Sequence, residues 1–313
     1  MDRNLALEFV RVTEAGAIAA AKWMGRGDKI AADKAAVDEM RARFSSVEFN
    51  GIIAIGEGKK DEAPELFVDE LVGTGQGVAL DIAVDPLECT NSVANGTPNA
   101  ISVIATGLRG TLFRAPDMYM NKIAGGPATK DVINLLDSPE NNIIRAANKL
   151  GKKVSEMVVM VLDRPRHEDL ITQIRQAGAR VRLITDGDVA GAIAPSLPDS
   201  GIDLLMGIGA SAEAVLASAA IKCLGGEFQA QLKPKNSAQE DELRGMGIID
   251  FNKIYTTEDL VSGNDITFTA TGVIDGPMLK GVRYTTDYCI THSVVMRVKT
   301  GTVRYLETWH RRK

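Results

Sequence analysis

The sequence predicts a mixed α/β protein that is built from more than one sheet. Apolar runs typical of buried strands alternate with segments whose apolar residues recur at helical spacing. Several of these runs have neighbouring residues that are all apolar, which indicates burial on both faces of a sheet. The length of 313 residues is sufficient for two packed units. Together these observations favour a two-part α/β architecture.

The N-terminal part begins with two predicted helices. Alanine, leucine and valine at helical spacing predict a helix over residues 4–24, which ends at Gly25–Gly27. Asp28 is suited to cap a second helix over residues 29–44, with Asp33 in its early turns. Strands are then predicted at residues 51–55, 78–84 and 100–105.

The C-terminal part is predicted as a second α/β series. The alternation of its elements suggests a mostly parallel sheet, and its last strands are compatible with either sheet. The best division of the chain is therefore residues 1–155 and 156–313. The predicted elements are helices at 131–150, 167–177 and 212–224, and strands at 157–162, 181–185, 203–208, 266–273 and 292–307.

Composition excludes several classes of protein. The net charge of −5 and the aromatic content of 5% argue against a nucleic-acid-binding protein. Cys89, Cys223 and Cys289 are odd in number and widely spaced, so neither a disulfide framework nor a zinc site is expected. With no signal peptide and no apolar run near the ~18 residues of a membrane span, we expect a cytoplasmic protein that does not bind a membrane.

The most informative segment runs from Asp81 to Thr90. An apolar run that suits a buried strand ends in Asp85, Pro86, Glu88 and Thr90. Clustered carboxylates are costly to bury unless a cation neutralises them, and Mg²⁺ and Mn²⁺ favour oxygen ligands. The segment therefore predicts half of a divalent-metal site beside a hydroxyl. The alternative is a structural cap for the following helix.

Other polar residues also follow predicted strands. Glu57 lies between two glycines after the first strand, and Asp61 follows shortly afterwards, although a polar turn is the simpler interpretation there. Ligands bind beyond the carboxyl ends of strands in sheets of this kind. Three further segments fall at such ends, namely 163–166, 186–188 and 209–213.

Taken together, these motifs resemble the class II fructose-1,6-bisphosphatases, within the lithium-sensitive, metal-dependent phosphatase superfamily. The resemblance implies a layered αβαβα sandwich with two sheet-containing halves and the site between them. The matching segments are residues 24–33, 55–58, 61–64, 81–90, 162–167 and 185–188, in the order of the family and along nearly the full chain.

The resemblance also implies roles for individual residues. Carboxylates would hold the metal ions, Thr90 would assist the attacking water with support from Asp61, and polar groups would bind the sugar bisphosphate. Arg164 and Arg166, on either side of Pro165, suit a forked grip on the phosphate that does not react. The implied metal ligands are Asp33, Glu57, Asp85, Glu88 and Glu213, and the implied substrate-binding residues are Glu88, Cys89, Thr90, Tyr119, Arg164, Pro165, Arg166, Asp186, Gly187, Asp188 and Ala210.

The implied activity is removal of the 1-phosphate of fructose 1,6-bisphosphate by a metal-bound water, as in gluconeogenesis, with Mn²⁺ or Mg²⁺ as cofactor. Sedoheptulose 1,7-bisphosphate and an inositol phosphate are alternative substrates. A weakly catalytic, metabolite-binding regulator of the same fold is a further alternative. The family also implies a homo-oligomer, either a dimer or a tetramer.

Three residues depart from the family pattern. Cys89 and Ala210 stand where glycine is usual, and Arg164 stands where lysine is expected. A side chain at position 89 restricts the backbone beside the reacting phosphate, whereas its amide remains able to donate a hydrogen bond. These departures bear on substrate choice and efficiency more than on phosphatase chemistry.

Overall fold

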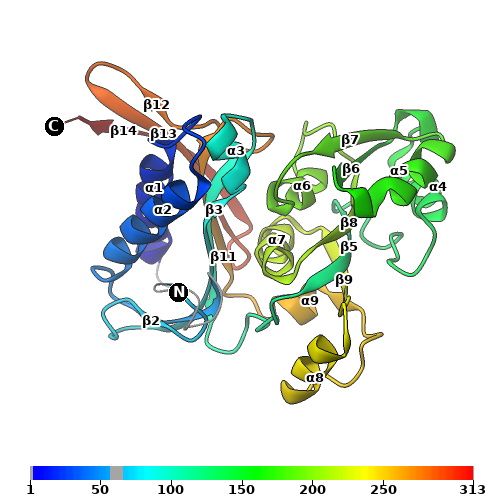
Figure 1. Ribbon diagram of the computed structural model, residues 1–313, viewed down its shortest axis with the longest axis horizontal. Helices are drawn as coiled ribbons and strands as arrows, with labels where there is room; N and C mark the ends of the chain where they lie inside the picture. Colours follow the sequence, from blue (N-terminus) through cyan, green and yellow to red (C-terminus); the bar gives the residue numbers. More distant parts are fainter. Residues whose placement is uncertain (1–2, 57–65, 313) are drawn as a thin grey trace. The chain divides into compact units, whose positions relative to one another are not determined.

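The chain folds into two compact units. A computed structural model describes residues 3–56 and 66–312 (Figure 1). The first unit comprises Met1–Phe113 and Gly263–Lys313, and the second comprises Arg114–Ser262. The structure thus divides the chain at different positions from the boundary expected after residue 155, and the chain returns to the first unit at Gly263.

The first unit contains one mixed sheet. Within the described residues this sheet has eight strands in the order β12-β13-β11-β4-β3-β1-β2, and β14 pairs with β13. The pairing of β1 with β3 is parallel and the other pairings are antiparallel. The closing strands therefore belong to the first sheet, which the sequence had left open. The strands are β1 Asn50–Ile55, β2 Leu71–Val72, β3 Ala79–Glu88, β4 Ala100–Leu108, β11 Thr267–Ile274, β12 Arg283–Tyr284, β13 Tyr288–Arg297 and β14 Thr302–Arg311.

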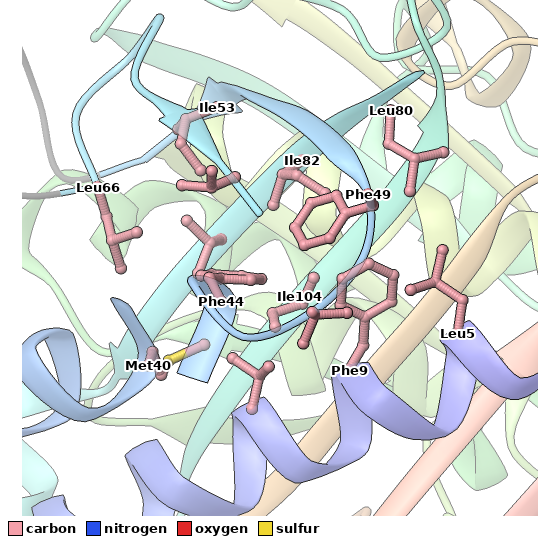
Figure 2. Packing of buried hydrophobic residues seen from close by; sticks show 14 of the residues in the cluster. Leu5, Phe9, Met40, Phe44, Phe49, Ile53, Leu66, Leu80, Ile82 and Ile104 are labelled. Atoms are coloured by element: carbon pink, nitrogen blue, oxygen red, sulfur yellow. The ribbon is translucent and has the colours of Figure 1, made fainter. Parts of the chain in front are cut away.

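Two long helices, α1 (Arg3–Ala21) and α2 (Lys29–Phe44), pack on this sheet. Asp28 caps α2 as predicted, because its side chain accepts a hydrogen bond of 3.0 Å from the Ala31 amide. Phe9 of α1 lies edge-to-face on Phe49, with ring centroids 5.3 Å apart, inside the buried cluster of Figure 2. Met40 and Phe44 of α2 belong to the same cluster, so this apolar packing holds both helices on the sheet.

The second unit contains a six-stranded sheet within the described residues, in the order β10-β9-β5-β8-β6-β7. The prediction of a mostly parallel sheet is wrong, because only the β8-β6-β7 portion is parallel and β5 pairs antiparallel with both β8 and β9. The strands are β5 Tyr119–Gly125, β6 Val158–Leu162, β7 Arg180–Ile184, β8 Leu204–Ala210, β9 Glu227–Leu232 and β10 Tyr255–Thr256.

Helices cover both faces of the second sheet. Val159 and Val161 of β6 lie in one buried cluster with α4 and α5, whereas Met160 lies in another with Ala194. Because alternate residues of a strand point to opposite faces, these clusters lie on opposite sides of the sheet. The helices are α4 Pro139–Leu150, α5 Glu168–Gln176, α6 Val189–Ile193, α7 Ser211–Leu224, α8 Ser237–Gly245 and α9 Thr257–Leu260, with short 3₁₀ turns at Val154–Glu156, Pro165–His167 and Ala194–Ser196.

The structure also corrects two element boundaries. The helix predicted over residues 131–150 begins only at Pro139, because Ser138 caps it and the proline occupies its first turn. The strand predicted over 292–307 is a hairpin of β13 and β14. In the part of the chain that the structure describes, no helix has the length and hydropathy needed to cross a membrane.

Candidate active site

The acidic end of β3 contains a β-bulge. Asp85 pairs with Val103 of β4, whereas Glu88 pairs with Ile101, so three steps on β3 match two steps on β4. In a regular strand, residues three positions apart point to opposite faces of the sheet. The extra residue of the bulge instead puts Asp85 and Glu88 on the same face. The Asp85 carboxylate also accepts a 3.0 Å hydrogen bond from the Leu87 amide, and Glu88 is buried.

A sharp turn follows the bulge. Cys89 has φ 76° and ψ 52°, the left-handed conformation, and is buried. Its carbonyl accepts hydrogen bonds from the Ser92 and Val93 amides, so the short helix α3 (Thr90–Asn95) begins directly after the turn. Thr90, the first residue of α3, is half-buried. Strand, bulge, turn and hydroxyl therefore occur within six residues.

Asp33 belongs to a helix that packs beside α3. The amides of Gly25 and Gly27 donate to the carbonyls of Val93 and Ala94 in α3, and the chain then enters α2, which carries Asp33. Burial raises the pKa of the Asp33 carboxyl to about 6. Such a carboxylate is costly to ionise without a nearby cation.

The arginines of the second unit have different partners. The Arg164 guanidinium forms an ion pair of 3.2 Å with Asp186 and donates to the carbonyls of Asp163 and Thr185. Arg166 donates twice to the carbonyl of Ile208, at 3.1 and 2.8 Å. These bonds join the ends of β6, β7 and β8, where Pro165 begins a short 3₁₀ turn.

The neighbouring His167 has a structural role. Its Nδ1 donates to the Leu162 carbonyl and its Nε2 accepts from the Ile208 amide, both at 2.7 Å. Burial lowers the pKa of this imidazole, so the neutral form that these two bonds require is favoured.

A buried lysine that the sequence reasoning missed lies at the centre of the second unit. Lys122 of β5 is almost fully buried, and its Nζ lies 2.8 and 3.0 Å from the two carboxylate oxygens of Asp188. The pair packs directly on Gly209, where an added Cβ would lie 2.1 Å from Asp188 Oδ2. The available signal was one charged residue next to the apolar residues Ile123 and Ala124.

Glu213, in the first turn of α7, is electrostatically linked to this ion pair. Burial raises the pKa of its carboxyl, and the positive charge of Lys122 opposes that rise. Glu213 Oε2 is shielded from solvent, and no described residue forms a hydrogen bond with it. Its chemistry fits a hard divalent cation, since an unpartnered buried carboxylate oxygen is the ligand that such an ion requires.

Tyr119 lies between the arginine segment and β9. The Arg166 guanidinium lies 4.8 Å and the Lys235 ammonium 4.3 Å from the centre of its ring. Ala210 pairs with Tyr119 in the β5–β8 register, so this departure from the family pattern adjoins the ring.

The predicted residues therefore fall into two groups. Asp33, Asp85, Glu88, Cys89 and Thr90 belong to the first unit, and Tyr119, Arg164–Arg166, Asp186–Asp188, Ala210 and Glu213 belong to the second. Glu57 and Asp61 lie outside the described residues. Within residues 3–56 and 66–312, no three His, Cys, Asp or Glu side chains meet in a metal-binding cluster.

Comparisons with known proteins agree with the sequence motifs. A family profile described as bacterial fructose-1,6-bisphosphatase, glpX-encoded, matches residues 3–310. The chain belongs to this family. A fructose-1,6-bisphosphatase class 2 from Haemophilus influenzae is 45% identical over 322 residues, which cover 99% of this chain and 97% of the relative. A protein from Synechococcus sp. (strain JA-3-3Ab), named D-fructose 1,6-bisphosphatase class 2/sedoheptulose 1,7-bisphosphatase, is 42% identical over 99% of this chain and 96% of its own.

Membership of the glpX-encoded family confirms the predicted resemblance. It indicates a phosphoric monoester hydrolase that depends on a divalent metal ion. The structure also gives the departure at position 89 a physical meaning, because Cys89 adopts a backbone conformation that favours glycine.

Proposed function

We propose that the protein hydrolyses the 1-phosphate of fructose 1,6-bisphosphate to fructose 6-phosphate and phosphate. The observation that carries the proposal is the β3 bulge, which sets Asp85 and Glu88 on one side of the sheet directly before the turn at Cys89 and the hydroxyl of Thr90. The names of the relatives from Haemophilus influenzae and Synechococcus support the same activity.

We propose that carboxylates hold the metal ions, which are Mn²⁺ or Mg²⁺. The ligands are Asp33, Glu57, Asp85 and Glu88 of the first unit and Glu213 of the second. A bound divalent ion neutralises phosphate charge and makes water more acidic. The pKa of Asp33, which burial raises, and the Oε2 of Glu213, which has no hydrogen-bond partner among the described residues, support these assignments.

The remaining roles belong to side chains and amides of this protein. Thr90 orients the attacking water and Asp61 supports it by accepting a proton. Water adds to phosphorus as it gives up one proton, the bond from phosphorus to the sugar 1-oxygen breaks, and that oxygen takes up one proton to become a hydroxyl, so no proton is gained or lost overall. Glu88, Cys89 and Thr90 contact the reacting phosphate.

The sugar and its second phosphate are assigned to the second unit. Here the proposed groups gather at the ends of strands β6, β7 and β8, with Tyr119 at the start of β5. They are Tyr119, Arg164, Pro165, Arg166, Asp186, Gly187, Asp188 and Ala210.

A second candidate substrate is sedoheptulose 1,7-bisphosphate. The names of relatives from two Synechococcus strains, which are 42% and 41% identical to this chain, include this activity. The two sugar bisphosphates share a hydrolysable phosphate and a distal one. We further propose a cytoplasmic homo-oligomer, a dimer or tetramer, with a place in gluconeogenesis.

The test is phosphate release from a panel of sugar and inositol phosphates, with Mn²⁺ or Mg²⁺ and after chelation. We expect release from fructose 1,6-bisphosphate that is lost on chelation and restored by the metal. Release only from an inositol phosphate would contradict the proposed substrate. Tight bisphosphate binding without any release would instead favour the metabolite-binding regulator.

A further inference from the structure

Two cations, Arg166 and Lys235, lie close to the ring of Tyr119. The Arg166 guanidinium and the Lys235 ammonium lie 4.8 and 4.3 Å from the ring centroid. Among the described residues, neither cation has an ion-pair partner, and the Arg166 hydrogen bonds go to the neutral carbonyl of Ile208. Lys235 is exposed to solvent.

In the other cation–ring contacts of this unit, the positive charge is also paired with a carboxylate. Lys253 lies 4.7 Å from the Tyr255 ring centre, but its ammonium also pairs with Asp259 at 2.9 Å. Arg244 lies over Phe251 and pairs with acidic residues of its own helix. In the described part of the chain, Tyr119 is the only ring within reach of two cations.

Unlike Arg166, Arg164 forms an ion pair with a carboxylate. Its guanidinium is occupied by Asp186 and by two backbone carbonyls. An arginine held in this way fixes the strand ends and has less capacity to bind an added anion. The two arginines that flank Pro165 are therefore not equivalent, and the free positive charge beside Arg166 comes from Lys235.

We infer that Arg166 and Lys235, which both contact the ring of Tyr119, form the receptor for the substrate phosphate that is not hydrolysed, with Lys235 as a specificity-determining residue. The inference rests on the proposed sugar-bisphosphate hydrolysis. Two nearby like charges repel each other in the free protein, and a dianionic phosphate relieves that repulsion. Arg166 offers a planar fork and Lys235 a compact charge on a flexible stem, so together they suit the several oxygens of one phosphate.

The test compares Lys235→Met and Lys235→Arg in the full-length protein with Mn²⁺. Lys235→Met keeps most of the alkyl stem and removes the charge. We expect the dissociation constant of fructose 6-phosphate, which carries only the retained phosphate, to rise about tenfold, the scale of one charge-assisted contact. The KM for fructose 1,6-bisphosphate should rise by about the same factor while kcat changes less than about twofold. Lys235→Arg should restore most of the affinity.

Lys253→Met is the matched control. Lys253 also contacts a tyrosine ring, that of Tyr255, but its ammonium forms an ion pair with Asp259. The substitution should change neither constant. Unchanged fructose 6-phosphate affinity in Lys235→Met, an equal loss in Lys253→Met, or no binding by the wild type would overturn the inference. Binding without turnover in the wild type would overturn the proposed function alone, because the affinity comparison does not require catalysis.

Discussion

The left-handed turn at Cys89 predicts an unusual order of stability among substitutions. We expect Cys89→Gly to be more stable than Cys89→Ala, although alanine is normally preferred to glycine. The conformation at φ 76° and ψ 52° costs a residue with a Cβ about 1–2 kcal/mol. Glycine avoids that cost but loses about 0.5–1 kcal/mol through its greater freedom in the unfolded chain. The expected net difference is about 0.5–1 kcal/mol in favour of glycine.

Both variants also lose the buried thiol. Cys89 belongs to an apolar cluster with Leu87 and Val93, and its Sγ accepts a long contact of 3.8 Å from Asn99. Loss of a small buried group costs about 1 kcal/mol. Cys89→Gly should therefore remain within about 1 kcal/mol of the wild type, and Cys89→Ala should be destabilised by about 1–2 kcal/mol.

Cys289 provides a matched control within the same unit. It is equally buried, but it lies in strand β13 with an ordinary extended backbone. There Cys289→Gly should be less stable than Cys289→Ala by about 0.5–1 kcal/mol. The assay is urea and thermal unfolding of all four variants with a chelator present, where 1 kcal/mol corresponds to roughly 2–4 °C. Alanine more stable than glycine at both positions would refute the argument from backbone strain.

Three further predictions concern the proposed site. Thr90→Ala should lower phosphate release by roughly 10²–10⁴-fold while calorimetry shows nearly unchanged bisphosphate binding; full activity would contradict the role assigned to the hydroxyl. Asp33→Asn should stabilise the metal-free protein at pH 7 but not near pH 4, because a carboxyl with a pKa raised to about 6 contributes stability that is present at low pH and lost as pH rises through 6; a gain that grows towards acid pH would show the wrong sign. Lys122→Met should cost about 3–5 kcal/mol by leaving Asp188 buried and unpaired, and Lys122→Met with Asp188→Asn should recover much of that loss in urea unfolding; equal stability of the single and double variants would contradict an ion-pair origin.

Local features of the fold could be predicted from the sequence because their causes are local. Asp28 precedes an apolar helical pattern and caps α2, and the apolar run before Asp85 forms strand β3. The site motif from Asp85 to Thr90 was visible for the same reason. The bulge that sets Asp85 and Glu88 on one side was not, because it is defined by the register with β4, which lies further along the chain.

Pairing between distant segments explains what could not be predicted. The boundary near residue 155 followed from the spacing of elements, whereas β5 pairs with β8 and β9 and so draws Tyr119–Gly125 into the second unit. Lys122 became interpretable only when this pairing placed it on Gly209 and against Asp188. The partners of Arg164 likewise come from strand ends that are distant in sequence.

The charges around Lys122 show why Glu213 is a good candidate metal ligand. One ammonium faces two buried carboxylates, and both oxygens of Asp188 bind it. Among the described residues Glu213 has a raised pKa and one oxygen without a hydrogen-bond partner, so these three side chains are one positive charge short when both acids are ionised. A purely structural cluster is expected to pair its buried charges, because an uncompensated one costs several kcal/mol. The missing positive charge beside Glu213 is therefore one that a bound divalent cation can supply. Asp188 needs no such ion, because Lys122 already provides its counter-charge.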